Sequence, residues 1–134
     1  VKDLDFGMQT LTVRFGKGGK DRTTLLPKSL QGALRDQIAM VKLQHRMDLK
    51  RGYGEVYLPH ALEKKYPQAA TSPGWQYLFP AAQLSRDPRA DKLRRHHIMA
   101  SSIQRQVSRA IRSSNIDKRA SCHTFRHSFA THLL

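Results

Sequence analysis

Hydrophobic and polar residues alternate near the start of the chain, and this pattern predicts a β-hairpin. Leu11, Val13 and Phe15 are separated by polar residues, which is the period-2 pattern of a half-buried strand. A glycine-rich turn follows, and residues 22–26 form the predicted return strand, which ends at Pro27 because proline has no N–H to donate.

Apolar residues at helical spacing predict a long helix after this hairpin. Leu30, Leu34, Ile38 and Val41 recur every three or four positions and define one apolar stripe. The helix is expected to run from about residue 28 to about residue 49, before a glycine-rich break at 52–54.

The rest of the chain falls into two parts with different patterns of residues. Between residues 59 and 97 the prolines and scattered aromatic residues exclude one long element, although a short helix over 60–65 is predicted. Ile103, Val107 and Ile111 then predict a helix over about 101–114. A loop over 115–121 and a final helix opening at His123 complete the prediction. The expected fold class is α+β and mainly α, with a small antiparallel sheet at one edge.

Length and composition indicate one globular domain or a piece of one. The chain has 134 residues, 39% of them hydrophobic, and no apolar run approaches the roughly 18 residues that a membrane helix needs. We therefore expect no membrane partner. The single cysteine, Cys122, cannot form an internal disulfide, which fits a reducing compartment such as the bacterial cytoplasm.

The charge balance favours a polyanionic partner. Twenty-four Lys and Arg residues stand against ten Asp and Glu residues, giving a formal net charge of +14. Such an excess suits nucleic acid, because each phosphate that is neutralised releases counterions. A membrane surface is the rival anion, but no long basic amphipathic helix with aromatic anchors is present in the sequence.

The most specific chemistry lies in the last twelve residues. His123 and Arg126 are three positions apart at the predicted start of a helix, so they share one helix face. A helix N-terminus favours anions, an arginine can bind a phosphate with two parallel hydrogen bonds, and a histidine can transfer a proton near neutral pH. This pattern predicts a phosphate-binding site.

Three blocks of sequence resemble the tyrosine recombinases, which cut and rejoin DNA. The terminal block, His123-x-x-Arg126-His127 with the apolar residues after it, is similar to the second conserved box of that family. The block 16–22, Gly-Lys-Gly-Gly-Lys-Asp-Arg, resembles its lysine-bearing β-hairpin. The middle block resembles the insertion of integron integrases in its three segments, at 61–67, 75–80 and 94–97. In order, the three blocks run nearly end to end and point to the integron branch.

The resemblance implies a division of catalytic roles. Arg126 would bind the non-bridging oxygens of the scissile phosphate, and His123 would assist by hydrogen bonding and proton transfer. Lys17 would protonate the leaving 5′-hydroxyl, although composition alone favours a solvated turn for this lysine. The reaction would pass through a 3′-phosphotyrosine and would need neither a metal nor a nucleotide cofactor.

The residues alone leave a metal hypothesis to consider. His123, His127 and His132 fall at spacings of four and five, and histidines at i and i+4 can bind Zn²⁺ from a helix. No carboxylate accompanies them and Cys122 is not suitably spaced, so we expect no metal site.

The middle block, residues 59–97, narrows the expected function. Taken alone, Trp75 and Phe79 favour a place in the core. The resemblance instead implies that four residues contact bases extruded from a folded single-stranded site: Trp75, Pro88, His96 and His97. Further DNA contacts are expected from basic residues of the hairpin and the insertion: Lys20, Arg22, Arg94 and Arg95. Two departures from the family pattern, Pro73-Gly74 in place of an aromatic residue and Phe125 in place of leucine, touch no catalytic residue.

Residues 1–134 are thus expected to form part of a tyrosine-recombinase catalytic domain, with 59–97 as its insertion. The resemblance places the first active-site arginine before Val1 and the nucleophilic tyrosine after Leu134, so this chain alone is expected to be inactive. The complete enzyme would act as a tetramer on DNA and would integrate or excise gene cassettes. Two alternatives remain open: a phage-type or chromosome-resolving recombinase that acts on duplex sites, and a non-catalytic basic DNA-binding module.

Overall fold

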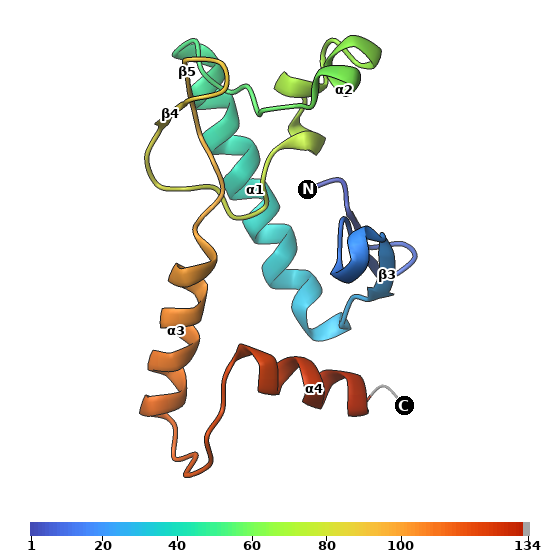
Figure 1. Cartoon of the computed structure of the whole chain (residues 1–134), viewed down its shortest axis with the longest axis vertical. Coiled ribbons are helices and arrows are strands. Elements are labelled where there is room, and N and C mark those ends of the chain that lie inside the picture. The colour runs from blue at the N-terminus through green and yellow to red at the C-terminus, as the bar shows by residue number, and fades with distance from the viewer. Residues whose placement is uncertain (133–134) are drawn as a thin grey trace. The chain divides into compact units, whose positions relative to one another are not determined.

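The computed structural model describes residues 1–132, except for the side chain of Lys17. The chain divides into two compact units, Val1–His97 and Ile98–Leu134, and each is described by itself (Figure 1). The fold is mixed α and β with small antiparallel sheets, as the sequence predicted. None of the described helices is long and apolar enough to cross a membrane.

A three-stranded antiparallel sheet opens the first unit. Its strands are β1 (Leu4–Asp5), β2 (Thr10–Val13) and β3 (Arg22–Leu25), in that order. The predicted hairpin is confirmed: β2 pairs with β3, with Thr10 opposite Leu25 and Val13 opposite Arg22. The two-residue β1 was not predicted, because it is too short to show a period-2 pattern.

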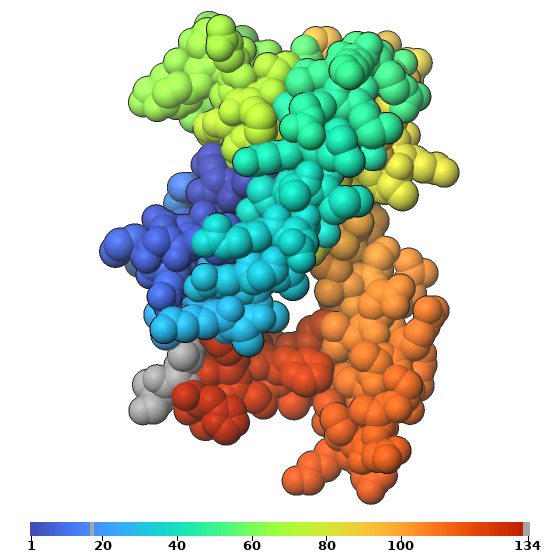
Figure 2. Space-filling model, turned by 180° about the vertical axis from the view of Figure 1, so that it is seen from behind, coloured from blue at the N-terminus to red at the C-terminus, as the bar shows by residue number. Residues whose placement is uncertain are grey.

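The long helix α1 (Lys28–Lys50) confirms the predicted element to within a residue. Its fully buried positions are Val41, His45 and Asp48, spaced by four and three residues, whereas Leu30 in the first turn is exposed. The buried stripe therefore continues the predicted periodicity but becomes polar toward the helix end. The opposite face is open, and Figure 2 shows α1 along the surface of this unit.

A small apolar core lies beside the short helix α2 (His60–Lys65), which confirms the predicted helix. The core consists of Val56, Leu58 and Ala69, and partly buried residues pack against it: Leu62, Ala70, Trp75 and Tyr77. Short 3-10 turns at Ala69–Thr71 and Pro73–Trp75 carry the chain across it.

A second hairpin follows, formed by β4 (Ser85–Asp87) and β5 (Lys92–Arg94). The sequence did not predict it, because Ser-Arg-Asp and Lys-Leu-Arg lack the apolar alternation of a half-buried strand. Its buried residues are Asp87 and Arg94, so charged groups occupy positions where most strands place apolar ones.

The second unit contains α3 (Ala100–Ser113) and α4 (Cys122–His132). The bounds of α3 agree with the prediction to within a residue. Helix α4 begins one residue before the predicted start, and its first turn contains no acidic residue.

Candidate nucleic-acid interface

The start of α4 is fixed by a reciprocal pair of side-chain caps. The Ser121 N–H donates to Thr124 Oγ1 at 3.0 Å, and the Thr124 N–H approaches Ser121 Oγ at 3.5 Å. Each hydroxyl satisfies a backbone donor that the helix itself leaves free, in the manner of a capping box. The cap fixes where the helix begins, and therefore which residues occupy its first turns.

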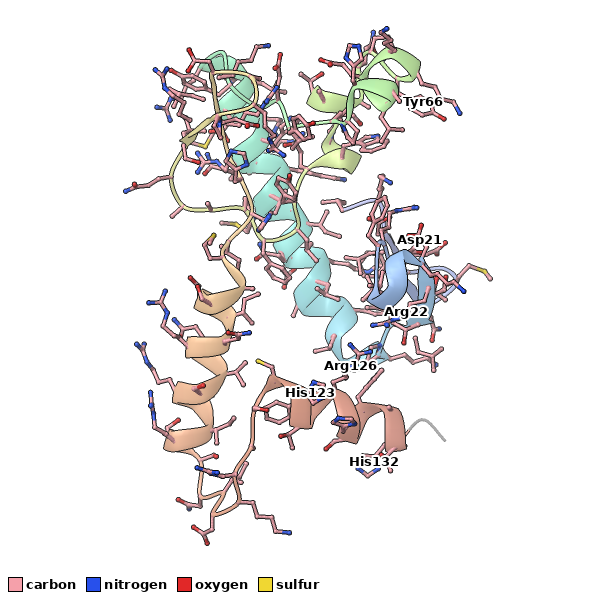
Figure 3. All side chains as sticks on the ribbon, in the orientation of Figure 1. Asp21, Arg22, Tyr66, His123, Arg126 and His132 are labelled. Atoms are coloured by element: carbon pink, nitrogen blue, oxygen red, sulfur yellow. The ribbon has the colours of Figure 1, made fainter. Side chains whose placement is uncertain are left out.

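His123 and Arg126 both lie in these first turns and are exposed (Figure 3). The His123 ring contacts the ring of His127 edge to face, with centroids 4.5 Å apart and an interplanar angle of 82°. Within the described residues, Arg126 forms no ion pair with a carboxylate. A guanidinium that forms no ion pair with a described carboxylate, on the same first turns as a histidine, is suited to bind an external phosphate.

His132 takes no part in this arrangement. It lies nine residues after His123, which is half a turn away on the helix surface. Among the described residues, no three side chains of His, Cys, Asp or Glu gather closely enough to hold a metal ion.

The hairpin tip of the first unit presents basic residues on a braced turn. The Gly16 N–H donates to the Lys20 carbonyl at 3.0 Å, and Gly18 and Gly19 have φ of 79° and 71°, which favour glycine. Arg14 pairs with Asp3 and Asp21 at 2.8 and 3.1 Å, which raises the pKa of its guanidinium. The backbone of Lys17 lies in this turn, but its predicted catalytic side chain is outside the described part. Lys20 and Arg22 are exposed.

Trp75 combines both of the environments considered from the sequence. One part of it packs against the small core, and Lys2 Nζ lies 4.2 Å from its ring centroid. It also lines an open groove of about 750 Å³ together with Tyr66, whose ring centroid is 6.4 Å away. Phe79 is 44% exposed, so the expectation of a core position is wrong for this residue.

The other predicted base-contacting residues follow on the chain. Pro88 is exposed in the turn between β4 and β5, and His96 is half-buried. The His97 ring meets the Tyr77 ring edge to face, at 5.2 Å between centroids. The Ala81 N–H donates to the His96 carbonyl at 2.6 Å, and Pro80 and His97 form an isolated bridge.

Arg94 and Arg95 were predicted to contact DNA, but their guanidinium groups have internal partners. Arg94 Nη1 donates to Asp87 at 2.9 Å, and Arg94 is 6% exposed. Arg95 binds both carboxylate oxygens of Asp48, at 2.6 and 2.9 Å. A role for either arginine on DNA stays a prediction, and we leave both out of the interface proposed below.

Four predicted base-contacting residues therefore belong to one unit: Trp75, Pro88, His96 and His97. The catalytic candidates do not, since Lys17 is in the first unit and His123 and Arg126 are in the second. Of the three catalytic candidates, the structure therefore describes the side-chain positions of His123 and Arg126 on one helix.

The sequence profile of the phage integrase family matches residues 1–134. This chain belongs to the phage integrase family. Two curated relatives are proteins named "Integrase/recombinase", one from Escherichia coli and one from Pseudomonas aeruginosa. Each is 46% identical over all 134 residues, and the chain spans 40% of the length of each relative.

Sequence reasoning missed the buried polar residues of this family member. Asp48, Asp87 and His45 are 2%, 0% and 4% exposed, and His45 Nε2 lies 3.2 Å from the Gly54 carbonyl oxygen. One signal was available: His45 and Asp48 are four and seven residues after Val41, so they extend the buried stripe of α1.

Proposed function

We propose that the protein containing this chain carries out site-specific DNA recombination as a tyrosine recombinase. Membership of the phage integrase family supports this proposal. The observation that carries it is the placement of His123 and Arg126 on the capped first turns of α4, where Arg126 forms no ion pair with any carboxylate of the described residues. The formal charge of +14 supports DNA as the partner.

The proposed reaction assigns each residue a task. Arg126 binds two non-bridging oxygens of the scissile phosphate, where negative charge develops during attack. His123 donates a hydrogen bond to the same phosphate and can transfer a proton near neutral pH. Lys17 protonates the 5′-oxygen as it leaves. The nucleophile is a tyrosine outside these 134 residues, and the phosphotyrosine bond conserves the energy needed for rejoining, without metal or nucleotide.

We further propose that residues 59–97 form an insertion of the integron-integrase type, which reads bases extruded from a folded single strand. Trp75 lines an open groove, and an aromatic ring in such a groove suits a stacked base. Pro88, His96 and His97 supply further contacts from the same unit. The complete protein would then bind attachment sites as a tetramer in the bacterial cytoplasm and capture or excise gene cassettes.

Three oligonucleotides test this assignment at about 0.15 M salt, where exposed charges separated by more than about 8 Å are largely screened. They are a single-stranded hairpin with two unpaired bases, the same hairpin without them, and the plain duplex. Tighter binding to the first supports the integron type, and Trp75→Ala should remove that preference. Equal binding to all three would favour a recombinase of duplex sites.

A second experiment separates an enzyme from a non-catalytic DNA-binding module. The chain is extended with the flanking sequence of its own gene and incubated with a nicked attachment site. A covalent protein–DNA adduct that Arg126→Ala abolishes supports the recombinase. Binding without any adduct would favour the module.

A further inference from the structure

The segment that carries Pro88, His96 and His97 has little apolar packing of its own. Strands β4 and β5 contain three residues each, and the buried positions between residues 80 and 97 are Asp87 and Arg94. A hairpin this short is marginal by itself in water. Polar contacts must therefore fix the conformation of this segment.

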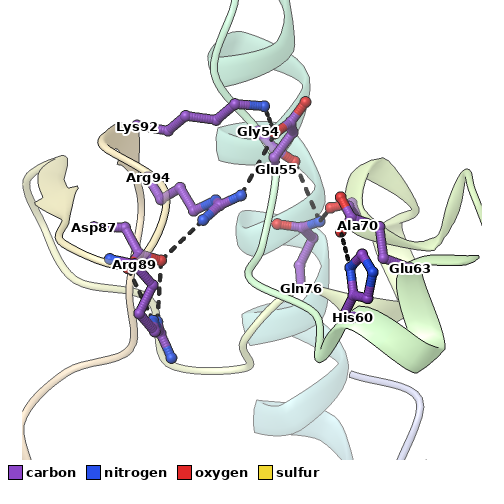
Figure 4. A network of polar contacts seen from close by, with 10 residues as sticks. All are labelled: Gly54, Glu55, His60, Glu63, Ala70, Gln76, Asp87, Arg89, Lys92 and Arg94. Carbon is purple, nitrogen blue, oxygen red and sulfur yellow. Dashed lines mark hydrogen bonds and ion pairs between the residues drawn. The ribbon is translucent and has the colours of Figure 1, made fainter.

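Asp87 is the centre of the first set of contacts (Figure 4). It accepts hydrogen bonds from Arg89 Nε at 2.9 Å, from Arg89 Nη2 at 3.0 Å and from Arg94 Nη1 at 2.9 Å. The Arg89 backbone N–H donates to the same carboxylate at 3.0 Å. The Arg89 guanidinium lies 3.6 Å from the centroid of the Tyr57 ring. These contacts close the turn that contains Pro88 around one buried carboxylate.

Asp48 is the centre of the second set and belongs to α1. Its carboxylate binds Arg95 through two hydrogen bonds and accepts a third from Gln44 at 3.0 Å. Arg95 Nη1 also donates to the carbonyls of Ala81 and Ala82, at 2.9 and 2.7 Å. Arg95, the residue before His96, is thereby attached both to helix α1 and to the segment of Ala81 and Ala82.

We propose that Asp48 and Asp87 are positioning residues, which hold Pro88, His96 and His97 in the arrangement that recognises unpaired bases. This inference rests on the proposed function of residues 59–97. Neither carboxylate touches DNA, since both are buried and bound by arginines. The insertion therefore owes its selectivity to two internal anions in a strongly basic protein.

The direction in which DNA affinity changes on removing a negative charge separates a positioning role from a purely electrostatic one. Replacing either aspartate by asparagine raises the net charge by one. Attraction to the DNA phosphates alone would therefore tighten binding to every DNA. Loss of positioning acts in the opposite direction, and only on the DNA with unpaired bases.

Asp91→Asn is the matched control, because it makes the same charge change on the same hairpin. The Asp91 side chain is 78% exposed and pairs with the exposed Arg86, whereas that of Asp87 is 0% exposed. Asp91 has a φ of 50°, a conformation that asparagine also tolerates. The control therefore keeps the turn and changes the same charge.

The measurement is the ratio of Kd values for the hairpin without and with the two unpaired bases. Asp48→Asn and Asp87→Asn should each reduce this ratio at least fivefold relative to Asp91→Asn, while plain-duplex Kd values agree within twofold. Equal ratios in all three variants would overturn the proposal. If an asparagine variant does not fold, Arg95→Lys or Arg89→Lys replaces it and is compared with the wild type, because lysine keeps the charge but cannot form the paired hydrogen bonds.

Amide hydrogen exchange without DNA keeps the two proposals separate. Exchange over residues 88–97 should accelerate at least tenfold in Asp48→Asn and Asp87→Asn but not in Asp91→Asn. Unchanged exchange overturns the positioning role, whatever the DNA results. A wild-type chain without any preference for unpaired bases contradicts the proposed function instead.

Discussion

Asp48 and Asp87 are two buried acidic residues in a strongly basic chain, and each binds arginine side chains. Both are acidic residues in a chain of net charge +14, and both are buried among arginines. Removing one partner of such a pair leaves an uncompensated buried charge, which is costly. At this scale, complementary ion pairs occupy buried positions alongside the small apolar core.

Acid should weaken the fold through Asp48. The hydrogen bonds from Arg95 lower the pKa of this carboxyl below its ordinary value of 3.8, with burial acting in the opposite direction. Its stabilising contribution is therefore complete above about pH 4 and is lost as pH falls through the lower, folded-state pKa. Denaturant titrations between pH 2 and 6 should show a smaller loss of unfolding free energy for Asp48→Asn than for the wild type. An identical slope would contradict this assignment.

Arg126 should be indispensable in the extended protein that carries the flanking sequence. Arg126→Lys keeps the charge but loses the planar pair of donors, so covalent adduct formation should fall by about 10²–10³-fold. His132→Ala, half a turn from His123, is the control and should form adduct at the wild-type rate. Comparable losses in both variants would remove the phosphate site from this face of α4.

At the scale of elements, two glycines in and after α1 have different backbone environments. Gly54 has a φ of 105°, and an added Cβ would lie 2.8 Å from Leu49 Cδ2. Gly32 lies inside the helix, where an added Cβ would meet nothing within 4 Å. Glycine is therefore required at position 54, whereas position 32 has room for a larger side chain.

Substituting alanine at each position should change stability in opposite directions. Gly32→Ala should raise the unfolding free energy by about 0.5–1 kcal/mol, because glycine is a poor helix former. Gly54→Ala should lower it by about 1–3 kcal/mol, through backbone strain and the clash with Leu49. Thermal and denaturant unfolding measure both, and destabilisation by Gly32→Ala would show that the exposed face of α1 is covered in solution.

For the whole molecule, the charge excess predicts a steep dependence of DNA binding on salt. If the chain contacts about six phosphates, its affinity for plain duplex should fall about a thousandfold between 50 and 200 mM salt. Fluorescence anisotropy at several salt concentrations gives the slope. A flat dependence would exclude a binding mode dominated by the phosphate backbone.

The elements that follow from local periodicity could be predicted from the sequence. The hairpin of β2 and β3 and the helices α1, α2, α3 and α4 fall within a residue or two of their expected bounds. Apolar spacing, glycine turns and proline breaks act between near neighbours, so the sequence records them directly. The motif of His123 and Arg126, and with it the family, was likewise visible in the sequence.

Only the tertiary structure determined which partner each buried charged residue has. Asp48 and Arg95 are 47 positions apart, so no local pattern could pair them. In the hairpin of β4 and β5, the buried Asp87 binds Arg89 and Arg94, which are two and seven positions away. Its strands lack apolar alternation, so their sequence resembles a solvated loop. The ion pair of Asp48 and Arg95 depends on a partner far away in the sequence, whereas a helix or a turn depends on near neighbours.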